Sequence, residues 1–220
     1  MLITEFSKTD PEFTAFFNDF YSDVLKQTQL DNKNLCLSIL AALIGCHGLE
    51  EFQSIIHSVL MTLSPVEVKE IIYQALAYLG LGRVYPFLAV INNVLEREKI
   101  ELPLEPQSTT TKKTRRTKGT KVQCKIFGDE MKDFWKSGPE ETRHINKWLA
   151  ENCFGDYYTR KGLDIKEREL ITFCFLAAQG GCEPQLTAHA LGNMKVGNDK
   201  EFLIRVVSQI VPFIDRKSVV

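Results

Sequence analysis

The sequence predicts an all-α fold made of two similar helical halves. Long stretches place apolar residues at a helical period, period-two alternation is scarce, and two of these stretches resemble each other along their length. The 220 residues are enough for one large domain or two small ones. The aliphatic and aromatic content is ordinary for a soluble globular protein.

The first predicted helix covers residues 9–27, "TDPEFTAFFNDFYSDVLKQ". Thr9 or Asp10 can cap this helix, and Pro11 suits its first turn. Its apolar stripe consists of Phe13, Phe16, Phe17, Phe20, Val24 and Leu25. By the same periodicity, further apolar helices are expected at residues 33–45, 50–61, 65–79 and 84–98.

Residues 107–121, "QSTTTKKTRRTKGTK", interrupt this pattern. Six basic residues and no acidic or large hydrophobic residue lie between Lys112 and Lys121. Such a segment buries too little apolar surface to offset the entropy lost on ordering, so it is predicted to be a solvated linker. The alternative is a basic arm for RNA, DNA or an acidic partner. The segment lacks the interleaved aromatic residues that stack on single strands, which disfavours that alternative.

The sequences on the two sides of this linker resemble each other. The first copy starts at Leu30 and the second at Leu163, and both begin Leu-Asp-x-Lys. Each copy reaches a Gln-x-x-x-His motif, at residues 53–57 and 185–189. This predicts an internal duplication, with helical domains at residues 1–106 and 122–220.

The two predicted domains differ at their ends. The first copy continues into the helix at residues 84–98, whereas the second has only "DRKSVV" after Ile214. We therefore expect the second domain to lack its last helix, through a truncated or altered C-terminus. The loss should expose an apolar patch or recruit a partner chain.

The stretch "GGCEPQLTAH", residues 180–189, carries the candidate site. Cys182, Gln185 and His189 fall at positions i, i+3 and i+7, which share one helical face. Glu169 lies on the preceding helix, and the glycine-rich turn is expected to fold the two helices into a hairpin. A carboxylate would then approach the thiol and the imidazole and form a proton-handling cluster. The first copy has Cys36 where the second has Glu169, so the site is expected in the second copy.

Other interpretations of these residues remain open. His189 can be a buried histidine bonded to a backbone carbonyl, with Cys182 as core filler. A Cys–His nucleophile is another possibility, because a nearby imidazolium lowers a thiol pKa. No metal is expected, since glutamine is a poor zinc ligand and the four histidines form no HExxH-like pair.

Charge and cysteine usage limit the environment and the partners. The formal net charge of −1 gives no reason to expect nucleic acid or an anionic membrane as a partner. No apolar run approaches the roughly 20 residues that span a bilayer, and the N-terminal residues do not have the pattern of a signal peptide. None of the six cysteines forms a C-x-x-C pair, and several lie in apolar helices. A reducing, cytoplasmic compartment is predicted.

Residues 154–170, "FGDYYTRKGLDIKEREL", followed by an alanine-rich helix and "GGCEPQLTAH", resemble the carboxymuconolactone decarboxylase family. The resemblance covers most of residues 122–214, and a degenerate copy covers about 30–98. It implies two tandem alkylhydroperoxidase-D-like domains, as in the double-domain subgroup of that family. It also implies a homo-oligomer, a trimer or an assembly like a hexamer.

The resemblance also implies roles for residues of the site. The peroxidase-type branch of the family has Cys-x-x-Cys-x-x-x-His and an upstream Glu; here Gln185 replaces the second Cys, which favours the decarboxylase branch. That branch needs no cofactor and would act on a small carboxylated lactone or related acid. His189 would be the acid, with Glu169 and Cys182 beside it. Residues that could bind the substrate are Gln185, Arg168 and Arg160.

Three candidate functions thus remain for this protein. The first is the decarboxylase-like enzyme, in which Arg168 has a structural ion pair as its alternative role, because it points about 100° away from Glu169 on the same helix. The second is a thiol-dependent peroxidase that uses Cys182 and requires a low thiol pKa. The third is a non-catalytic oligomeric binding protein with no pocket beside His189.

Overall fold

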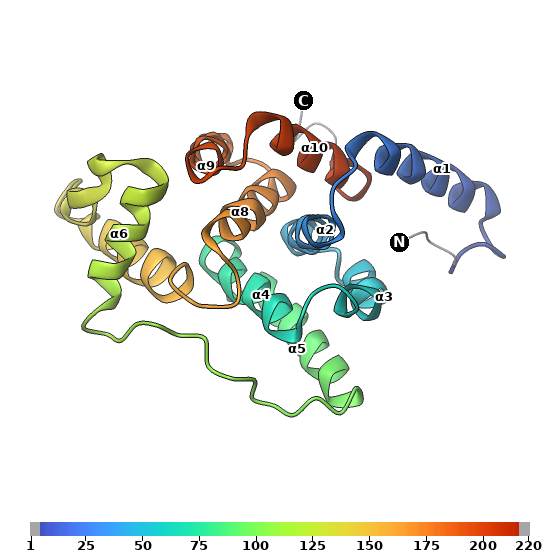
Figure 1. Ribbon diagram of the computed structural model, residues 1–220, viewed down its shortest axis with the longest axis horizontal. Coiled ribbons are helices and arrows are strands. Elements are labelled where there is room, and N and C mark those ends of the chain that lie inside the picture. Colours follow the sequence, from blue (N-terminus) through green and yellow to red (C-terminus); the bar gives the residue numbers. More distant parts are fainter. Residues whose placement is uncertain (1–4, 216–220) are drawn as a thin grey trace.

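The computed structural model describes residues 5–215, and every regular element within them is helical (Figure 1). The all-α prediction is confirmed for this part of the chain. In chain order the elements are α1 (Pro11–Thr28), α2 (Asn32–Cys46), α3 (Leu49–Leu60), α4 (Pro65–Leu79), α5 (Leu81–Arg97), α6 (Arg115–Phe127), the 3-10 helix η1 (Asp129–Lys136), α7 (Arg143–Trp148), the π-helix η2 (Leu149–Tyr157), α8 (Ile165–Gln179), α9 (Glu183–Val196), α10 (Lys200–Ile210) and the 3-10 helix η3 (Val211–Phe213).

Helices α2 and α8 form the centre of the molecule and pack along each other. Both begin in the same way: Asp31 and Asp164 cap the helices by accepting a hydrogen bond from the backbone N–H three residues later. Gly45 permits the close approach of the two helices, because a Cβ there would lie 2.8 Å from the carbonyl oxygen of Phe175. One apolar core surrounds this helix pair and draws buried residues from both halves of the chain.

Several other elements pack across the boundary between the N-terminal half (residues 5–106) and the C-terminal half (residues 107–215). Helix α4 packs on α8, while α10 packs on α2; α1 lies against α10, while η2 lies against α4. In Figure 1 the C-terminal helix α10 accordingly lies beside α1, the first helix of the chain. The main apolar core therefore draws on both halves of the chain, and a smaller buried cluster of Ile126, Cys153, Phe154 and Tyr158 lies in the C-terminal half.

The hairpin predicted around residues 180–189 is present. Helices α8 and α9 pack against each other across the turn at Gly180 and Gly181, whose φ angles of 68° and 66° suit glycine. Cys182 is the N-cap of α9, with Pro184 in the first turn of the helix. The turn brings the start of α9 back along the end of α8.

The predicted solvated linker is partly wrong. Residues 107–114 contain no helix, but α6 begins at Arg115 within the predicted segment. The π-helix η2 orders this part of the chain, because Arg115 donates to Glu151 and to Asp156, and Gly119 lies so close that a Cβ would clash with the Ala150 carbonyl. Composition alone gave no sign of these partners.

No helix follows η3 within the described residues, and the last residues of the predicted truncated end, 216–220, lie outside the described range. In the N-terminal half, α5 covers α3 and α4. The corresponding surface of the C-terminal half holds a groove lined partly by Phe173, Met194, Leu203 and Val207. Ile204, on the same surface, is 55% exposed. The surface where the sequence predicts an exposed apolar patch thus carries a groove and an exposed isoleucine.

Candidate active site

An open cavity of about 690 Å³ lies between α4, α6, η1, η2, α8 and α9. Its wall is mostly apolar. The residues that line it are Ala77, Tyr78, Gln123, Phe127, Met131, Phe134, Leu149, Cys153, Phe154, Leu176, Gln179, Cys182, Pro184, Gln185, Ala188 and His189. Three of the predicted site residues, Cys182, Gln185 and His189, therefore share one cavity.

His189 and Glu169 form a buried pair beside this cavity. The imidazole Nδ1 lies 2.9 Å from Oε2 of Glu169, and the glutamate is fully buried behind the histidine. Gly192 leaves room for that carboxylate, because a Cβ there would lie 2.7 Å from Oε2. The Asn193 amide donates to the backbone oxygens of both Glu169 and His189, which fixes α8 against α9. The carboxylate therefore orients the imidazole without itself lining the cavity.

Two tyrosines complete a ring of polar groups around the pair. Tyr158 donates to Oε1 of Glu169 at 2.7 Å, and Tyr78 donates to the hydroxyl of Tyr158 at 3.1 Å. The hydroxyl of Tyr78 also lies 3.5 Å from Nε2 of His189, which closes the ring. Thr172 adds a further hydroxyl, 2.7 Å from that of Tyr158.

The tyrosines remain protonated at neutral pH. Burial raises the pKa of Tyr158 well above its usual value, and the charge of Glu169 raises it further. Burial likewise raises the pKa of Tyr78, with Cys153 and Glu169 adding to the effect. In the tautomer whose Nδ1–H donates to Oε2 of Glu169, Nε2 carries the lone pair. Nε2 is then the ring nitrogen able to exchange a proton with a bound molecule.

The aromatic surroundings hold the imidazole in place. Tyr78 and Phe127 contact His189 edge-on, with ring centroids 5.6 and 5.3 Å away. Tyr78 comes from α4 in the N-terminal half and Phe127 from the end of α6. Residues from outside the α8–α9 hairpin therefore complete the site.

The environment of Cys182 does not activate its thiol. Its Sγ donates to the backbone oxygen of Leu176 at 3.4 Å. Burial raises the pKa of Cys182, and neighbouring Glu183 raises it further. The other cysteine of the cavity wall, Cys153, has its pKa raised by burial to about 12. A thiol peroxidase needs the opposite shift, toward the thiolate.

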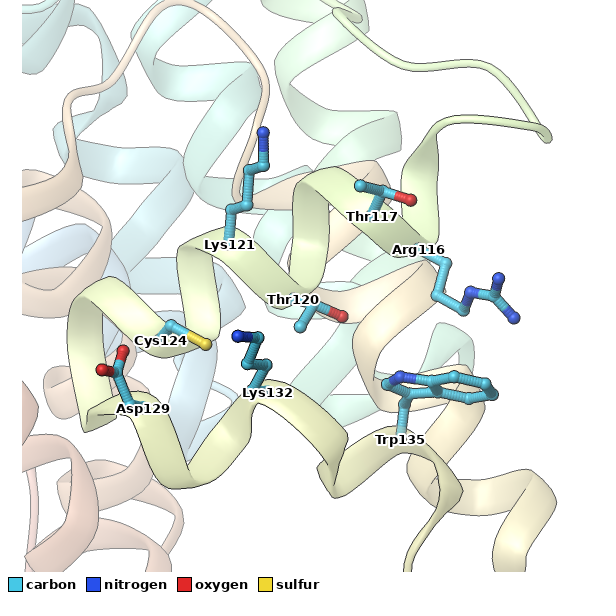
Figure 2. A pocket seen from close by; sticks show the side chains of 8 residues that line it. All are labelled: Arg116, Thr117, Thr120, Lys121, Cys124, Asp129, Lys132 and Trp135. Carbon is cyan, nitrogen blue, oxygen red and sulfur yellow. The ribbon is translucent and has the colours of Figure 1, made fainter.

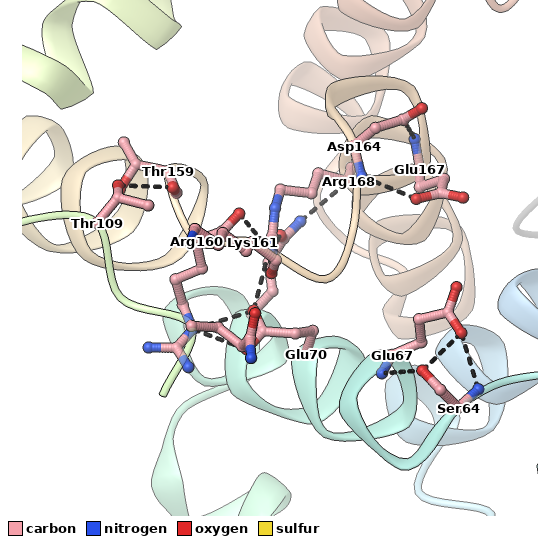
Figure 3. Close-up of polar contacts among 12 residues, drawn as sticks. Ser64, Glu67, Glu70, Thr109, Thr159, Arg160, Lys161, Asp164, Glu167 and Arg168 are labelled. Atoms are coloured by element: carbon pink, nitrogen blue, oxygen red, sulfur yellow. Dashed lines mark hydrogen bonds and ion pairs between the residues drawn. The ribbon is translucent and has the colours of Figure 1, made fainter. Parts of the chain in front are cut away.

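Arg168 and Arg160 lie outside the cavity, in a buried network centred on Glu70 of α4 (Figure 3). Arg168 donates to Glu70 and to Gln74 as well as to the backbone oxygens of residues 160 and 161. Arg160 donates to both carboxylate oxygens of Glu70. The geometry thus matches the structural ion pair that was the alternative role of Arg168. It also leaves the cavity wall without a lysine or arginine.

Two basic residues of α6, Arg116 and Lys121, line a different hollow of about 450 Å³ between α6 and η1 (Figure 2). Arg116, Lys121 and Lys132 line it, together with Asp129 and Trp135. The guanidinium of Arg116 lies 4.3 Å from the centre of the Trp135 ring. These cations are thus separate from the cavity beside His189.

Two further properties concern residues 5–215. Within them, no group of three or more His, Cys, Asp or Glu side chains is arranged to hold a metal ion. The helices of that range include none with both the length and the apolar character that a bilayer span requires.

Sequence reasoning missed three residues of the site: Tyr78, Tyr158 and Gln123. Tyr158 lies within the "FGDYYTRKGLD" stretch that carried the family resemblance, so its position was available. Tyr78 is 111 residues from His189 in sequence, and no local spacing connects the two. Gln123 lies two residues after the predicted linker and has no neighbours in sequence that signal a site.

Comparisons with known proteins support the all-α fold over most of the chain and the family resemblance over residues 144–215. A crystal structure described as that of a gamma-carboxymuconolactone decarboxylase subunit from Burkholderia xenovorans LB400 superposes with a TM-score of 0.60. The two sequences are 20% identical, and the superposition covers 94% of this chain and 81% of the other. No curated protein matches the sequence.

The family model for "Carboxymuconolactone decarboxylase family" matches residues 144–215, which include Glu169, Cys182 and His189. Through this segment, about a third of the chain, the protein is similar to the carboxymuconolactone decarboxylase family.

Proposed function

We propose that the cavity is the active site of a cofactor-free, carboxymuconolactone decarboxylase-like enzyme that acts on a small carboxylated lactone or related acid. The observation that carries the proposal is the buried Glu169–His189 pair, whose imidazole lines an open cavity of substrate size. A buried structural histidine would have no need of such a space. The match of residues 144–215 to the family model supports the same class of reaction.

In this proposal His189 is the proton donor. The substrate loses CO₂ when its C–C bond to the carboxylate breaks, and the electron pair remains on carbon, delocalised into the neighbouring carbonyl as an enolate. A protonated His189 then delivers a proton from Nε2 to that carbon, and the imidazole takes up a proton from solvent to begin again. The overall change is the replacement of a carboxylate by hydrogen, with one proton consumed and one CO₂ released.

The surrounding residues prepare His189 for this role. Glu169 would stabilise the imidazolium and hold the ring by Nδ1, as its 2.9 Å contact suggests. Tyr158 and Tyr78 would keep the carboxylate and Nε2 connected through hydroxyl groups. Gln185 and Cys182 would form part of the wall that meets the substrate.

A screen of carboxylated lactones and β-keto acids for CO₂ release tests the proposal. The protein should accelerate release from at least one of them, and Glu169→Gln should lower that rate while the helical circular dichroism signal is unchanged. The proposal fails if no member of the screen is turned over, or if Glu169→Gln leaves the rate unaltered.

We also propose that the protein forms a homo-oligomer. Large apolar side chains are exposed on helices at opposite ends of the sequence, among them Phe13 and Phe16 of α1, Leu191 of α9 and Ile204 of α10. Such surfaces commonly mark contacts between chains. Light scattering coupled to size exclusion should give a mass that is a multiple of 25.1 kDa; a mass equal to one chain would contradict the oligomer.

A further inference from the structure

Gln123 of α6 is fully buried and lines the same cavity as His189. Neither Oε1 nor Nε2 of its amide has a hydrogen-bond partner in the protein. Within residues 5–215 it is the only side chain with two such buried, unpartnered atoms. A hydrogen-bond donor and a hydrogen-bond acceptor without protein partners therefore lie together at the wall of the cavity.

An unpartnered buried amide destabilises a folded protein, because it loses its hydrogen bonds to water and gains none in return. A leucine of similar size would fill the same space without that penalty. Gln74 shows the contrast: it is equally buried, but its amide donates to Arg168 O and Thr172 Oγ1 and accepts from the Arg168 guanidinium. Polar groups that weaken the fold in this way are typical of binding sites, where a ligand supplies the missing partners.

The charge of the cavity limits what such a ligand can be. No lysine or arginine lines the wall, and His189 is the one lining residue of a type that can carry a positive charge. The arginines that could have bound carboxylates are engaged by Glu70. A ligand with two negative charges would be desolvated here with at most one opposing charge, which is strongly unfavourable.

We infer that Gln123 is a specificity-determining residue, and that the cavity selects a single-ring compound with no more than one negative charge. Nε2 of Gln123 donates to a carbonyl oxygen of the ligand, and Oε1 accepts from its hydroxyl or N–H group. The apolar wall contacts the ring. The inference rests on the proposed function only in taking the cavity as the substrate site, and it narrows the substrate to a carbonyl compound with a single carboxylate.

Gln123→Leu and Gln74→Leu form a matched pair for the first part of the test. Without ligand, Gln123→Leu should raise the melting temperature by about 2–4 °C, because it removes an unsatisfied buried group. Gln74→Leu should lower the melting temperature, because it leaves Arg168 and Thr172 without a partner. A lowered melting temperature for Gln123→Leu would show that the amide is a structural group and would overturn the inference.

The second part compares two probes of equal size, neutral phthalamide and dianionic phthalate, by isothermal titration calorimetry on the full chain. Phthalamide should bind the unchanged protein at least tenfold more tightly than phthalate, and Gln123→Leu should weaken phthalamide binding by roughly 5- to 100-fold. Equal affinity for the two probes, binding of neither at millimolar concentration, or undiminished phthalamide binding to Gln123→Leu would each overturn the inference.

These measurements do not depend on turnover. Phthalamide binding through Gln123 in a protein that releases no CO₂ from any substrate would reject the proposed reaction and leave the specificity residue standing. Decarboxylation that depends on His189 in a protein whose affinity for phthalamide is unaffected by Gln123→Leu would do the reverse.

Discussion

The two Gln-x-x-x-His motifs lie at equivalent places on α3 and α9, yet their histidines have different surroundings. The side chain of His57 is 59% exposed and pairs with exposed Glu98, whereas that of His189 is 8% exposed and pairs with fully buried Glu169. Helix α5 lies against α3 in the N-terminal half, and α6 lies against α9 in the C-terminal half. The helix hairpin alone thus does not make a site; the elements that cover it determine whether a cavity remains.

The largest expected effect separates the two histidines. His189→Ala should lower the decarboxylation rate by about 10²–10⁴-fold, because it removes the proton donor, whereas His57→Ala should change it less than twofold. CO₂ release measures the rates, and circular dichroism confirms that both variants fold. Equal losses of rate in the two variants would show that His189 and His57 do not differ in their contribution to the reaction.

The next effect concerns stability, through the network that joins α4 to α8. Glu70→Gln removes the carboxylate that pairs with Arg160 and Arg168 and should destabilise the protein by about 3–5 kcal/mol. Glu98→Gln, at the exposed pair with His57, should cost less than about 1 kcal/mol. Urea unfolding gives both values. A large rise in KM with unchanged stability in Glu70→Gln would instead place the arginines in substrate binding.

Tyr78 tests whether the N-terminal half contributes to chemistry in the C-terminal half. Tyr78→Phe removes the hydroxyl beside Nε2 of His189 and should lower kcat about tenfold, with little change in melting temperature. Tyr85→Phe is the matched control, because Tyr85 is 65% exposed on α5 and does not line the cavity. A kcat unchanged by Tyr78→Phe would reduce the N-terminal half to a scaffold.

The smallest effect is a pH dependence of stability at the ion pairs of Lys33. Its Nζ lies 2.7 Å from Glu67 and 2.5 Å from Glu167, which hold matching positions in the capping boxes of α4 and α8. Burial alone would raise the pKa of Glu67, but hydrogen bonds from Lys33 and Ser64 lower it overall. The stabilisation is therefore present above the unfolded pKa of Glu67 and is lost as pH falls through the lower folded value.

The pKa of Lys33 itself is raised, since its hydrogen bonds to Glu167 and Glu67 outweigh burial. Its contribution is present below the unfolded lysine pKa and lost as pH rises through the folded value. Lys33→Met should thus lower stability by less than about 1 kcal/mol at pH 7 and by less still at pH 3. Urea unfolding at the two pH values checks this; an equal loss at both would contradict the ion pairs.

Local sequence signals predicted the parts of the fold that depend on neighbouring residues. The aspartate caps of α2 and α8 and the double-glycine turn before α9 follow from side-chain and backbone chemistry within a few positions. The approach of Glu169 to His189 followed from the hairpin. The order of α6 could not be predicted in this way, because its stabilising partners, Glu151 and Asp156, lie more than 30 residues away.

The same limit applied to the site. Tyr78 reaches His189 only through the packing of α4 on α8, which no spacing in the sequence encodes. Arg168 looked equally suited to a substrate carboxylate or to a structural pair, and only the position of Glu70 distinguishes the two roles. Gln123 could not be identified from the sequence, because only the structure shows that its buried amide has no hydrogen-bond partner.

Turnover in D₂O, on a carboxylated lactone identified by the CO₂ screen, tests the central assignment most directly. The product should carry one deuterium on the carbon that lost CO₂, and His189→Ala should lower the rates of CO₂ release and of deuterium incorporation together, by about 10²–10⁴-fold. A His189→Ala protein that releases CO₂ and labels the product at the unchanged rate would show that His189 is not the proton donor.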